Sequence, residues 1–227
     1  VMPLVSEGAN LETASVNELS LVKKMLESAT FNPKIRILCN GPKTEKYIAL
    51  IDDLQHRGLS VVPIIEGPNE VGVFGQSRYE VGVRVDIPKS VTVTSRWDKA
   101  VDRFGFAAEE LLKLGRLRNL KILHYHVGSQ IVKQADILQP LRFVLKVYAQ
   151  LKKINPGLDT IDIGGGMPIP YDRRSGYSIT NLAGQILRLM KNFADREGVA
   201  HPNLIAEWGR YIVAPAQVTI YKTIDVK

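Results

Sequence analysis

The chain has 227 residues, of which 45% are hydrophobic and 23% charged, a composition typical of one sizeable folded α/β core. It has neither the run of roughly 18 apolar residues that a membrane span requires nor a basic, apolar leader over residues 1–10, so we expect a cytoplasmic protein without a membrane partner. The single Cys39 excludes an internal disulfide and a multi-cysteine metal site. The net charge of +7 is spread over helix faces without an aromatic-basic stripe, so we expect no nucleic-acid partner.

Apolar periodicity predicts helices and strands in alternation. In chain order, we predict a helix over 16–29, a strand over 35–41, a helix over 44–58, strands over 60–67 and 80–87, a helix over 104–117, a strand from 120, a helix over 138–154, a strand over 160–166, a helix over 180–198, and strands over 203–210 and 217–226. Pro63 is unusual for a central strand. The connection over 67–79 is too short for a full helix, and the polar stretch over 88–102 indicates a loop.

Alternation of this kind gives a parallel sheet with right-handed crossovers. A (β/α)8 barrel closes with eight strand-helix units in typically about 250 residues. Six or seven strands precede the last one predicted here, so we expect an α/β fold of the TIM-barrel type that is incomplete in this chain. No linker or repeat divides residues 1–227, which we expect to form one domain.

Three strands end in groups that suit a ligand. The strand from 120 ends in His126, Gly128, Ser129 and Gln130, the next ends in three consecutive glycines at 164–166, and a third ends in Glu207, Gly209 and Arg210. In parallel α/β folds the chemistry gathers at the carboxyl ends of the strands. An imidazole, a hydroxyl, bare amides, an acid and a guanidinium suit a flat heteroaromatic ring that carries a phosphate.

Each of these features has a simpler interpretation. His124 and His126 leave the strand on the same face, as a hydrogen-bonded pair or as the HxH part of a metal site. Zinc needs three or four protein ligands, and the other histidines, His56 and His201, are not at strand ends, so we expect no metal. The glycines alone would make a tight turn. Glu207 must have a partner, and Arg210 would provide one in a purely structural ion pair.

The motifs YHVGSQ, DIGGG and EWGR, in this order, resemble the pyridoxal-phosphate-dependent, fold-type III decarboxylases with the alanine-racemase-like barrel. LETASVNEL, CNG followed by KTEKYI, GRLRNLKILHYHVGSQ and HPNLIAEWGR are most similar to the biosynthetic arginine decarboxylases. The resemblance implies decarboxylation of L-arginine to agmatine and CO2 in polyamine and spermidine biosynthesis. The diaminopimelate decarboxylases share HxGSQI, GGG and ExGR, so this or another basic amino acid is an alternative substrate. A non-catalytic relative that binds a partner is a further alternative.

The same resemblance implies the roles of individual residues toward pyridoxal 5'-phosphate. His126 would stack on the pyridine ring, and Glu207 would bond the ring nitrogen and keep it protonated, so both are the expected catalytic residues. Ser129, the amides of Gly164, Gly165 and Gly166, and Arg210 would hold the phosphate.

Four further residues match the family less closely. Glu12 and Arg84 would line the ring, and Tyr171 and Asp172 would contact the amino-acid substrate. The family's shared active sites imply a homodimer or a higher homo-oligomer.

Two parts of the family pattern are missing from this sequence. The Schiff-base lysine of the family lies on the first barrel strand, upstream of Val1, and the nearest candidates here, Lys43 and Lys121, do not stand at a comparable strand end. The C-terminal β domain, toward which the last residues lead, is also absent. We therefore expect a fragment that does not turn over alone.

Overall fold

The computed structural model describes residues 2–27, 34–91, 104–171 and 177–216, and its centre is one parallel sheet. The sheet has seven strands in the order of the chain, so every neighbouring pair is joined by a crossover. The strands are β1 (Leu11–Thr13), β2 (Arg36–Cys39), β3 (Ser60–Ile65), β4 (Val81–Arg84), β5 (Leu120–His124), β6 (Thr160–Asp162) and β7 (Asn203–Ile205).

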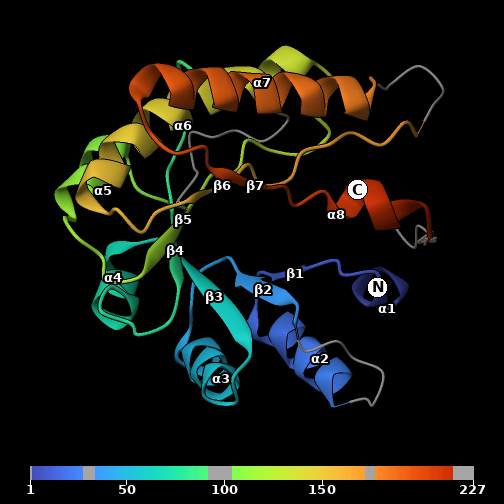
Figure 1. Cartoon of the computed structure of the whole chain (residues 1–227). Helices are drawn as coiled ribbons and strands as arrows, with labels where there is room; N and C mark the ends of the chain where they lie inside the picture. Colours follow the sequence, from blue (N-terminus) through green and yellow to red (C-terminus); the bar gives the residue numbers. More distant parts are fainter. Residues whose placement is uncertain (1, 28–33, 92–103, 172–176, 217–227) are drawn as a thin grey trace, which may run out of the picture.

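The helices lie on the outer side of the curled sheet, and the two labelled chain ends lie beside its open side, near β1 and α8 (Figure 1). They are α1 (Met2–Ser6), α2 (Val16–Leu26), α3 (Glu45–His56), α4 (Pro68–Phe74), α5 (Ala108–Lys113), α6 (Gln134–Ile154), α7 (Ile179–Glu197) and α8 (Gly209–Val213), followed by a 3-10 turn at Ala214–Ala216. Within the described ranges β1 and β7 each pair with one neighbour only. The prediction of an incomplete barrel is confirmed. None of the described helices is both long and apolar enough to cross a bilayer.

Local sequence signals set the helix ends. The hydroxyl of Ser15 accepts from the backbone N–H of Glu18, and the Glu18 carboxylate in turn accepts from the Ala14 N–H, which starts α2. Thr44 caps α3 in the same way. Gly198 ends α7 in the left-handed conformation, with a φ of 64°.

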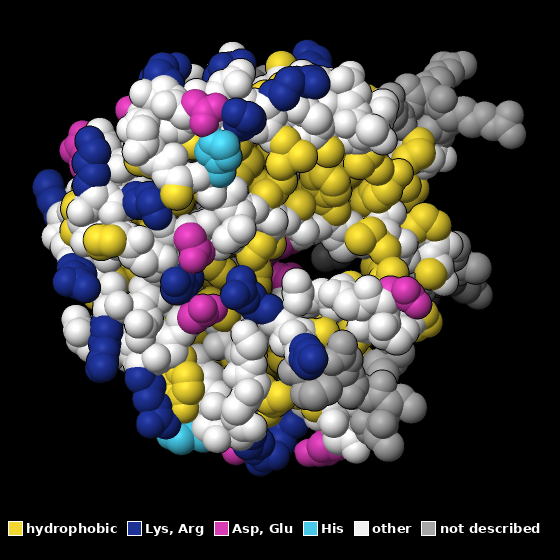
Figure 2. Space-filling model, in the orientation of Figure 1, with side chains coloured by type: hydrophobic (Ala, Val, Ile, Leu, Met, Phe, Trp, Pro, Cys, Tyr) yellow, Lys and Arg dark blue, Asp and Glu magenta, His cyan; other side chains and the backbone are white. Residues whose placement is uncertain are grey.

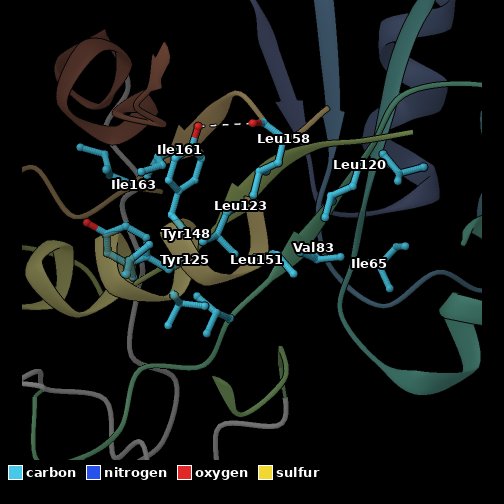
Figure 3. Close-up of a cluster of buried hydrophobic side chains, with 14 of the residues drawn as sticks. Ile65, Val83, Leu120, Leu123, Tyr125, Tyr148, Leu151, Leu158, Ile161 and Ile163 are labelled. Carbon is cyan, nitrogen blue, oxygen red and sulfur yellow. Dashed lines mark hydrogen bonds between the residues drawn. The ribbon is translucent and has the colours of Figure 1, made fainter. Parts of the chain in front are cut away.

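The outer face of the sheet packs against the helices and forms the main core. Figure 3 shows Leu123, Tyr125 and Ile161 from the β5 and β6 segments beside Tyr148 and Leu151 of α6. Each of these side chains is at most 1% exposed, and burying a large apolar side chain stabilises a fold by about 1.5–3 kcal/mol. The Tyr148 hydroxyl donates to the Leu158 carbonyl at 3.3 Å, so this core residue keeps a hydrogen bond (Figure 3).

The inner face of the sheet forms a second, smaller core. Leu38, Val62, Ile64 and Ile122 cluster there, with Ile205 packed against them. Gly82 lies among them, and a Cβ at that position would be 3.1 Å from the Cβ of Ile122. The inside of the curl is therefore filled by side chains, as in other barrels of this kind.

The structure corrects several boundaries. Leu11–Thr13 was not predicted as a strand, and the connection over 67–79 holds the seven-residue helix α4. The helix predicted from 104 begins only at Ala108, because Gly105 has a φ of 88° and Phe106 bridges in parallel to Val85. Pro63 does lie in a central strand, aligned with Cys39. Residues 92–103 and 217–227 lie outside the described residues, so the expected loop is tested only over 88–91 and the last strand not at all.

Candidate active site

Polar side chains gather on the inner side of the sheet, where the strands end. Successive residues of a strand point to opposite faces, so an inner residue is followed two positions later by another inner residue. On six strands that next residue is polar; the pairs are Leu38 and Asn40, Ile64 and Glu66, Gly82 and Arg84, Ile122 and His124, Thr160 and Asp162, and Ile205 and Glu207. The inner apolar core thus supports a polar layer at the mouth of the curl. Figure 2 shows hydrophobic side chains gathered along the open side of the curled sheet, below α7.

Glu207 lies near the centre of this layer, with a side chain only 12% exposed. Asn40 Nδ2 donates to Glu207 Oε1 at 2.7 Å, and His124 Nε2 lies 3.6 Å from Oε2. The Glu207 N–H donates to the Gly164 carbonyl at 3.0 Å. No ion pair joins Glu207 to Arg210, which is exposed on α8 and has no partner among the described residues. The structural ion pair considered from the sequence is therefore not formed.

The pKa values of the two neighbouring acids, Glu207 and Asp162, shift in opposite directions. Burial alone would raise the pKa of Glu207, but the electrostatic effect of the neighbouring His124 and the hydrogen bond from Asn40 outweigh it and hold this pKa at about 2. Burial, followed by repulsion from Glu207, raises the pKa of Asp162 well above its usual value. These opposite shifts favour the negative charge on Glu207 rather than on Asp162, whose Oδ1 accepts from the Gly164 N–H at 2.9 Å.

Several buried polar atoms beside Glu207 have no hydrogen-bond partner among the described residues. They are Asn40 Oδ1, both ring nitrogens of His124, and Asp162 Oδ2. His124 is 1% exposed and Asp162 is fully buried. An unsatisfied buried polar group costs about 1–3 kcal/mol, so their concentration at one place indicates a site built for a ligand.

The triple glycine leaves no room for side chains. A Cβ on Gly164 would lie 2.5 Å from the Tyr125 carbonyl oxygen, and one on Gly166 would lie 2.8 Å from Ile131 Cδ1. Their φ values of 62° and 114° also require glycine. The Gly164 N–H already donates to Asp162, and the Gly165 N–H donates to His126 Nδ1 at 3.2 Å. Only the Gly166 N–H is without an acceptor among the described residues.

The loops after β5 and β6 are clamped together. The side chain of Gln130 accepts from the Ile169 N–H at 2.7 Å and donates to the Ile169 carbonyl at 3.2 Å. The Ile131 N–H donates to the Gly166 carbonyl at 3.0 Å. Ser129, between these contacts, is half-buried and has no hydrogen-bond partner in the part of the chain that the structure describes. A hydroxyl and a free amide are therefore held on one rigid double loop.

The four residues expected to line the ring or contact the substrate differ in their surroundings. Glu12 has an exposed side chain near the acidic centre, and desolvation, followed by repulsion from Glu207, raises its pKa to about 7. Arg84 is occupied by Glu66, at 3.2 Å, and lies 5.3 Å from the centre of the Phe104 ring. Tyr171 is 68% exposed, and Asp172 lies outside the described residues.

Neither candidate lysine is available to a cofactor. The Lys43 amine is fully buried, bonds the Ile64 carbonyl and lies 3.3 Å from Glu70. Lys121 pairs with Asp159 at the beginning of β5, the end of the sheet opposite the mouth. The structure thus agrees with the expectation that neither is the Schiff-base lysine.

Sequence reasoning missed Asn40, Asp162 and Glu66, and it gave His124 no part beyond a pair with His126. The signal that finds them is the two-residue alternation, which carries the inner face of each strand into its exit. His124, Asp162 and Glu207 also place ligand atoms within 4.8 Å of one another, a spacing that a metal site would have. His56 and His201 pair with Asp52 and Asp195 on the exposed surface, as their sequence positions predicted.

Comparison with known proteins identifies the family. The description "Pyridoxal-dependent decarboxylase, pyridoxal binding domain" belongs to a family pattern that matches residues 1–214. The chain belongs to the pyridoxal-dependent decarboxylase family. A biosynthetic arginine decarboxylase of Pseudomonas aeruginosa is 30% identical over 214 residues, which cover 84% of this chain and 33% of that protein. One from Rhodopirellula baltica is 31% identical over 251 aligned positions, covering 100% of this chain and 37% of that protein. The chain thus spans about a third of these decarboxylases.

Solved structures of decarboxylases share the fold. The biosynthetic arginine decarboxylase of Campylobacter jejuni superimposes with a TM-score of 0.71 at 23% identity, covering 89% of this chain and 35% of that one. The diaminopimelate decarboxylase of M. jannaschii, in complex with L-lysine, gives a TM-score of 0.73 at 21% identity, covering 93% of this chain and 50% of that one. These likenesses establish the fold.

The cofactor of the family is pyridoxal phosphate, and the residues present fit it. The unpartnered atoms of Asn40, His124 and Asp162 surround an anionic carboxylate that suits a protonated ring nitrogen. Gly164 and Gly166 leave no room for a Cβ, so the loop after β6 presents bare backbone. The cofactor expected from the sequence is thereby confirmed.

Proposed function

We propose that the full-length protein decarboxylates L-arginine to agmatine and CO2 with pyridoxal phosphate, a reaction that feeds polyamine synthesis. The observation that carries the proposal is the buried anion of Glu207, held by Asn40 and His124 at the mouth where His126 and the triple glycine converge. The arginine decarboxylases at 30–31% identity support the choice of substrate.

His126 and the anion of Glu207 would hold the cofactor ring. Gly165 fixes the His126 imidazole through its Nδ1, so the ring face is set by the loop after β6. Ser129 and the Gly166 amide would bind the phosphate from the clamped double loop, with Gly164 and Gly165 shaping that loop. Arg210, unpaired among the described residues, would add charge to the phosphate through its fork of donors. Glu12 and Arg84 line the mouth at a greater distance from the ring.

Pyridoxal phosphate, when bound, supplies an electron sink for the pair of electrons that remains on Cα when CO2 departs. Glu207 holds a proton at the ring nitrogen, because a carboxylate with a pKa of about 2 favours a cation beside it. Asn40 and His124 keep that carboxylate ionised and oriented, which matters most as charge develops. Tyr171 and Asp172 would contact the amino-acid substrate.

The organisation of the whole protein follows from the same proposal. Residues 1–227 would form the barrel part of a subunit that works in a homodimer or larger assembly. The protein works in the cytoplasm on a small amino acid, and this stretch alone is inactive.

A substrate panel on the intact protein tests the proposal. Release of CO2 from L-arginine, diaminopimelate, L-lysine and L-ornithine is measured with saturating pyridoxal phosphate. We expect the highest kcat/KM with L-arginine. A preference for diaminopimelate would replace the substrate, and no release from any of them, in a protein that binds the cofactor, would support the non-catalytic alternative.

Arg210→Ala tests the phosphate grip. We expect the cofactor concentration for half-saturation of the absorbance band to rise by about tenfold or more, because a charge-assisted contact worth about 1.5–3 kcal/mol is lost. Arg188→Ala is the matched control, since Arg188 is an exposed, unpaired arginine on α7. It lines a cavity of about 640 Å³ between α6 and α7 that contains no residue of the site. Equal effects of the two changes would contradict the assignment of Arg210.

A further inference from the structure

We propose that His124 and Asp162 are positioning residues that act through Glu207: from β5 and β6 they hold its carboxylate as a single fixed anion facing the cofactor ring. This inference rests on the proposed function and deepens it. It adds two residues to the site that touch neither the phosphate nor the substrate.

The geometry places the pair behind Glu207. Asn40 binds Oε1 at 2.7 Å and His124 stands 3.6 Å from Oε2, so both oxygens of the carboxylate are addressed from the inner side of the sheet. Asp162 completes the group, with the nearest ligand atoms of the trio within 4.8 Å of one another. A carboxylate held at both oxygens cannot rotate freely, and the fixed orientation is what a preorganised site requires.

Burial and charge give the pair its function. His124 and Asp162 are 1% and 0% exposed, so bulk water does not reach either side chain. The Gly164 N–H binds Asp162 Oδ1 and leaves Oδ2 as the position for its proton. Burial and repulsion from Glu207 raise the pKa of Asp162, which favours the negative charge on Glu207, and His124 Nε2 faces Glu207 Oε2 at 3.6 Å.

A structural role alone does not explain this arrangement. Polar groups that serve only the fold are usually satisfied by hydrogen bonds, yet both ring nitrogens of His124 and Asp162 Oδ2 are not. The other charged groups near Glu207 are Glu12 on β1, and Glu66 with Arg84 at the ends of β3 and β4. Glu12 and Glu66 are acids, and Arg84 is engaged by Glu66, so among the described residues His124 is the ring that stands against Glu207 Oε2.

The experiment is a double-mutant cycle in the full-length holoenzyme with L-arginine. His124→Gln should lower kcat by about 10–100-fold, the usual cost of losing a supporting partner, while KM changes by less than about threefold. The acid limb of the kcat/KM profile, and the pH titration of the bound cofactor's absorbance band measured without substrate, should both move to higher pH, because Glu207 loses the contact of His124 with its Oε2. In the Glu207→Gln background the same change should have no further effect. His201→Gln, which alters an exposed, paired histidine, is the control.

Asp162→Asn tests whether Asp162 acts through its shape and hydrogen-bonding capacity rather than through a negative charge. Asparagine copies the shape and the donor of a protonated acid, so Asp162→Asn should retain clearly more of kcat than Asp162→Ala does. Additive losses in the His124/Glu207 cycle, an unmoved acid limb, or equal losses in Asp162→Asn and Asp162→Ala would each overturn the inference. If His124→Gln does not fold, the cycle is run with Asp162→Ala in its place. A wild-type protein that neither binds the cofactor nor releases CO2 would instead refute the proposed function.

Discussion

Two buried polar groups lie side by side at the mouth of the sheet, and they differ in how completely they are satisfied. In the closed network, Glu66, Glu70, Lys43 and Arg84, two acids face two cations. Glu66 accepts from the Gly41 N–H at 2.6 Å and pairs with Arg84, and Glu70 pairs with Lys43 and accepts from the Lys43 and Glu66 amides. In the open cluster, His124, Asp162 and Glu207, two acids face one imidazole and three atoms lack partners.

The closed network stabilises the fold, and the open cluster belongs to the ligand site. The closed network ties the exits of β2, β3 and β4 together and leaves nothing for a ligand to satisfy. The open cluster costs stability unless a ligand completes it, which is expected where binding or catalysis is selected over folding. We therefore expect substitutions in the closed network to lower the free energy of unfolding and substitutions in the open cluster to lower turnover.

Lys43→Ala should produce the largest loss of stability. It leaves Glu70 as an uncompensated buried charge, and breaking a buried pair in this way costs about 3–5 kcal/mol. Urea unfolding of the full-length apoprotein, followed by circular dichroism, measures the free energy of unfolding. Lys121→Ala, which removes a half-exposed pair with Asp159, should cost at most about 1 kcal/mol. A loss no larger than that of Lys121→Ala would remove the distinction between the closed network and an ordinary surface pair.

Glu207→Ala should produce the largest loss of turnover with little loss of folding. We expect kcat to fall by about 10²–10³-fold, as when a charge-stabilising group is removed, while the absorbance band of the bound cofactor survives. Unchanged turnover would show that the open cluster is not the chemical centre. Glu66→Gln should lower the free energy of unfolding and leave turnover less affected. The urea unfolding curves of Glu207→Ala and Glu66→Gln are compared as the control.

Gly164→Ala should destabilise more than Gly198→Ala, although the two glycines have nearly equal φ values of 62° and 64°. A left-handed conformation costs alanine about 1–2 kcal/mol at either position. Only at Gly164 does the new Cβ meet another atom, the Tyr125 carbonyl oxygen at 2.5 Å, whereas nothing lies within 4 Å at Gly198. The difference between their unfolding free energies therefore measures how tightly the open cluster is packed. Equal values would mean that the loop yields.

Asp162→Asn should change how stability depends on pH. The pKa of Asp162 is raised above its ordinary 3.8, so its contribution to stability is largest below that value and declines as the pH rises toward the pKa of the folded state. In that window the wild type should lose about 1.4 kcal/mol per pH unit relative to the variant. Glu207 behaves oppositely, losing its contribution as the pH falls from 4.5 toward 2. Parallel stability curves for the two proteins would show that Asp162 is ionised.

The sequence predicted most elements and the three site-bearing exits, because periodicity and glycine act locally. The core positions of β2 to β7 follow from their apolar runs, and Ser15, Thr44 and Gly198 mark helix ends by chemistry that needs no tertiary contact. Phe106 was misassigned to a helix because its bridge to Val85 depends on a strand outside its own segment.

The partners within the site were beyond local reasoning. Asn40, His124 and Asp162 meet Glu207 only when the sheet curls, and the engagement of Arg84 by Glu66 depends on the register between β3 and β4. The same limit explains the phosphate assignment. The amides of Gly164 and Gly165 look free in a run of glycines, yet the fold gives both an acceptor.

The bond from Asn40 to Glu207 joins residues 167 positions apart. Contacts of such sequence separation form slowly during folding, because a long loop must close before they are gained. The carboxylate therefore reaches its working place only after nearly all the intervening strands have assembled. A ligand that binds this carboxylate therefore binds only chains in which the whole curled sheet has formed. By mass action it stabilises the folded chain relative to every partly folded one.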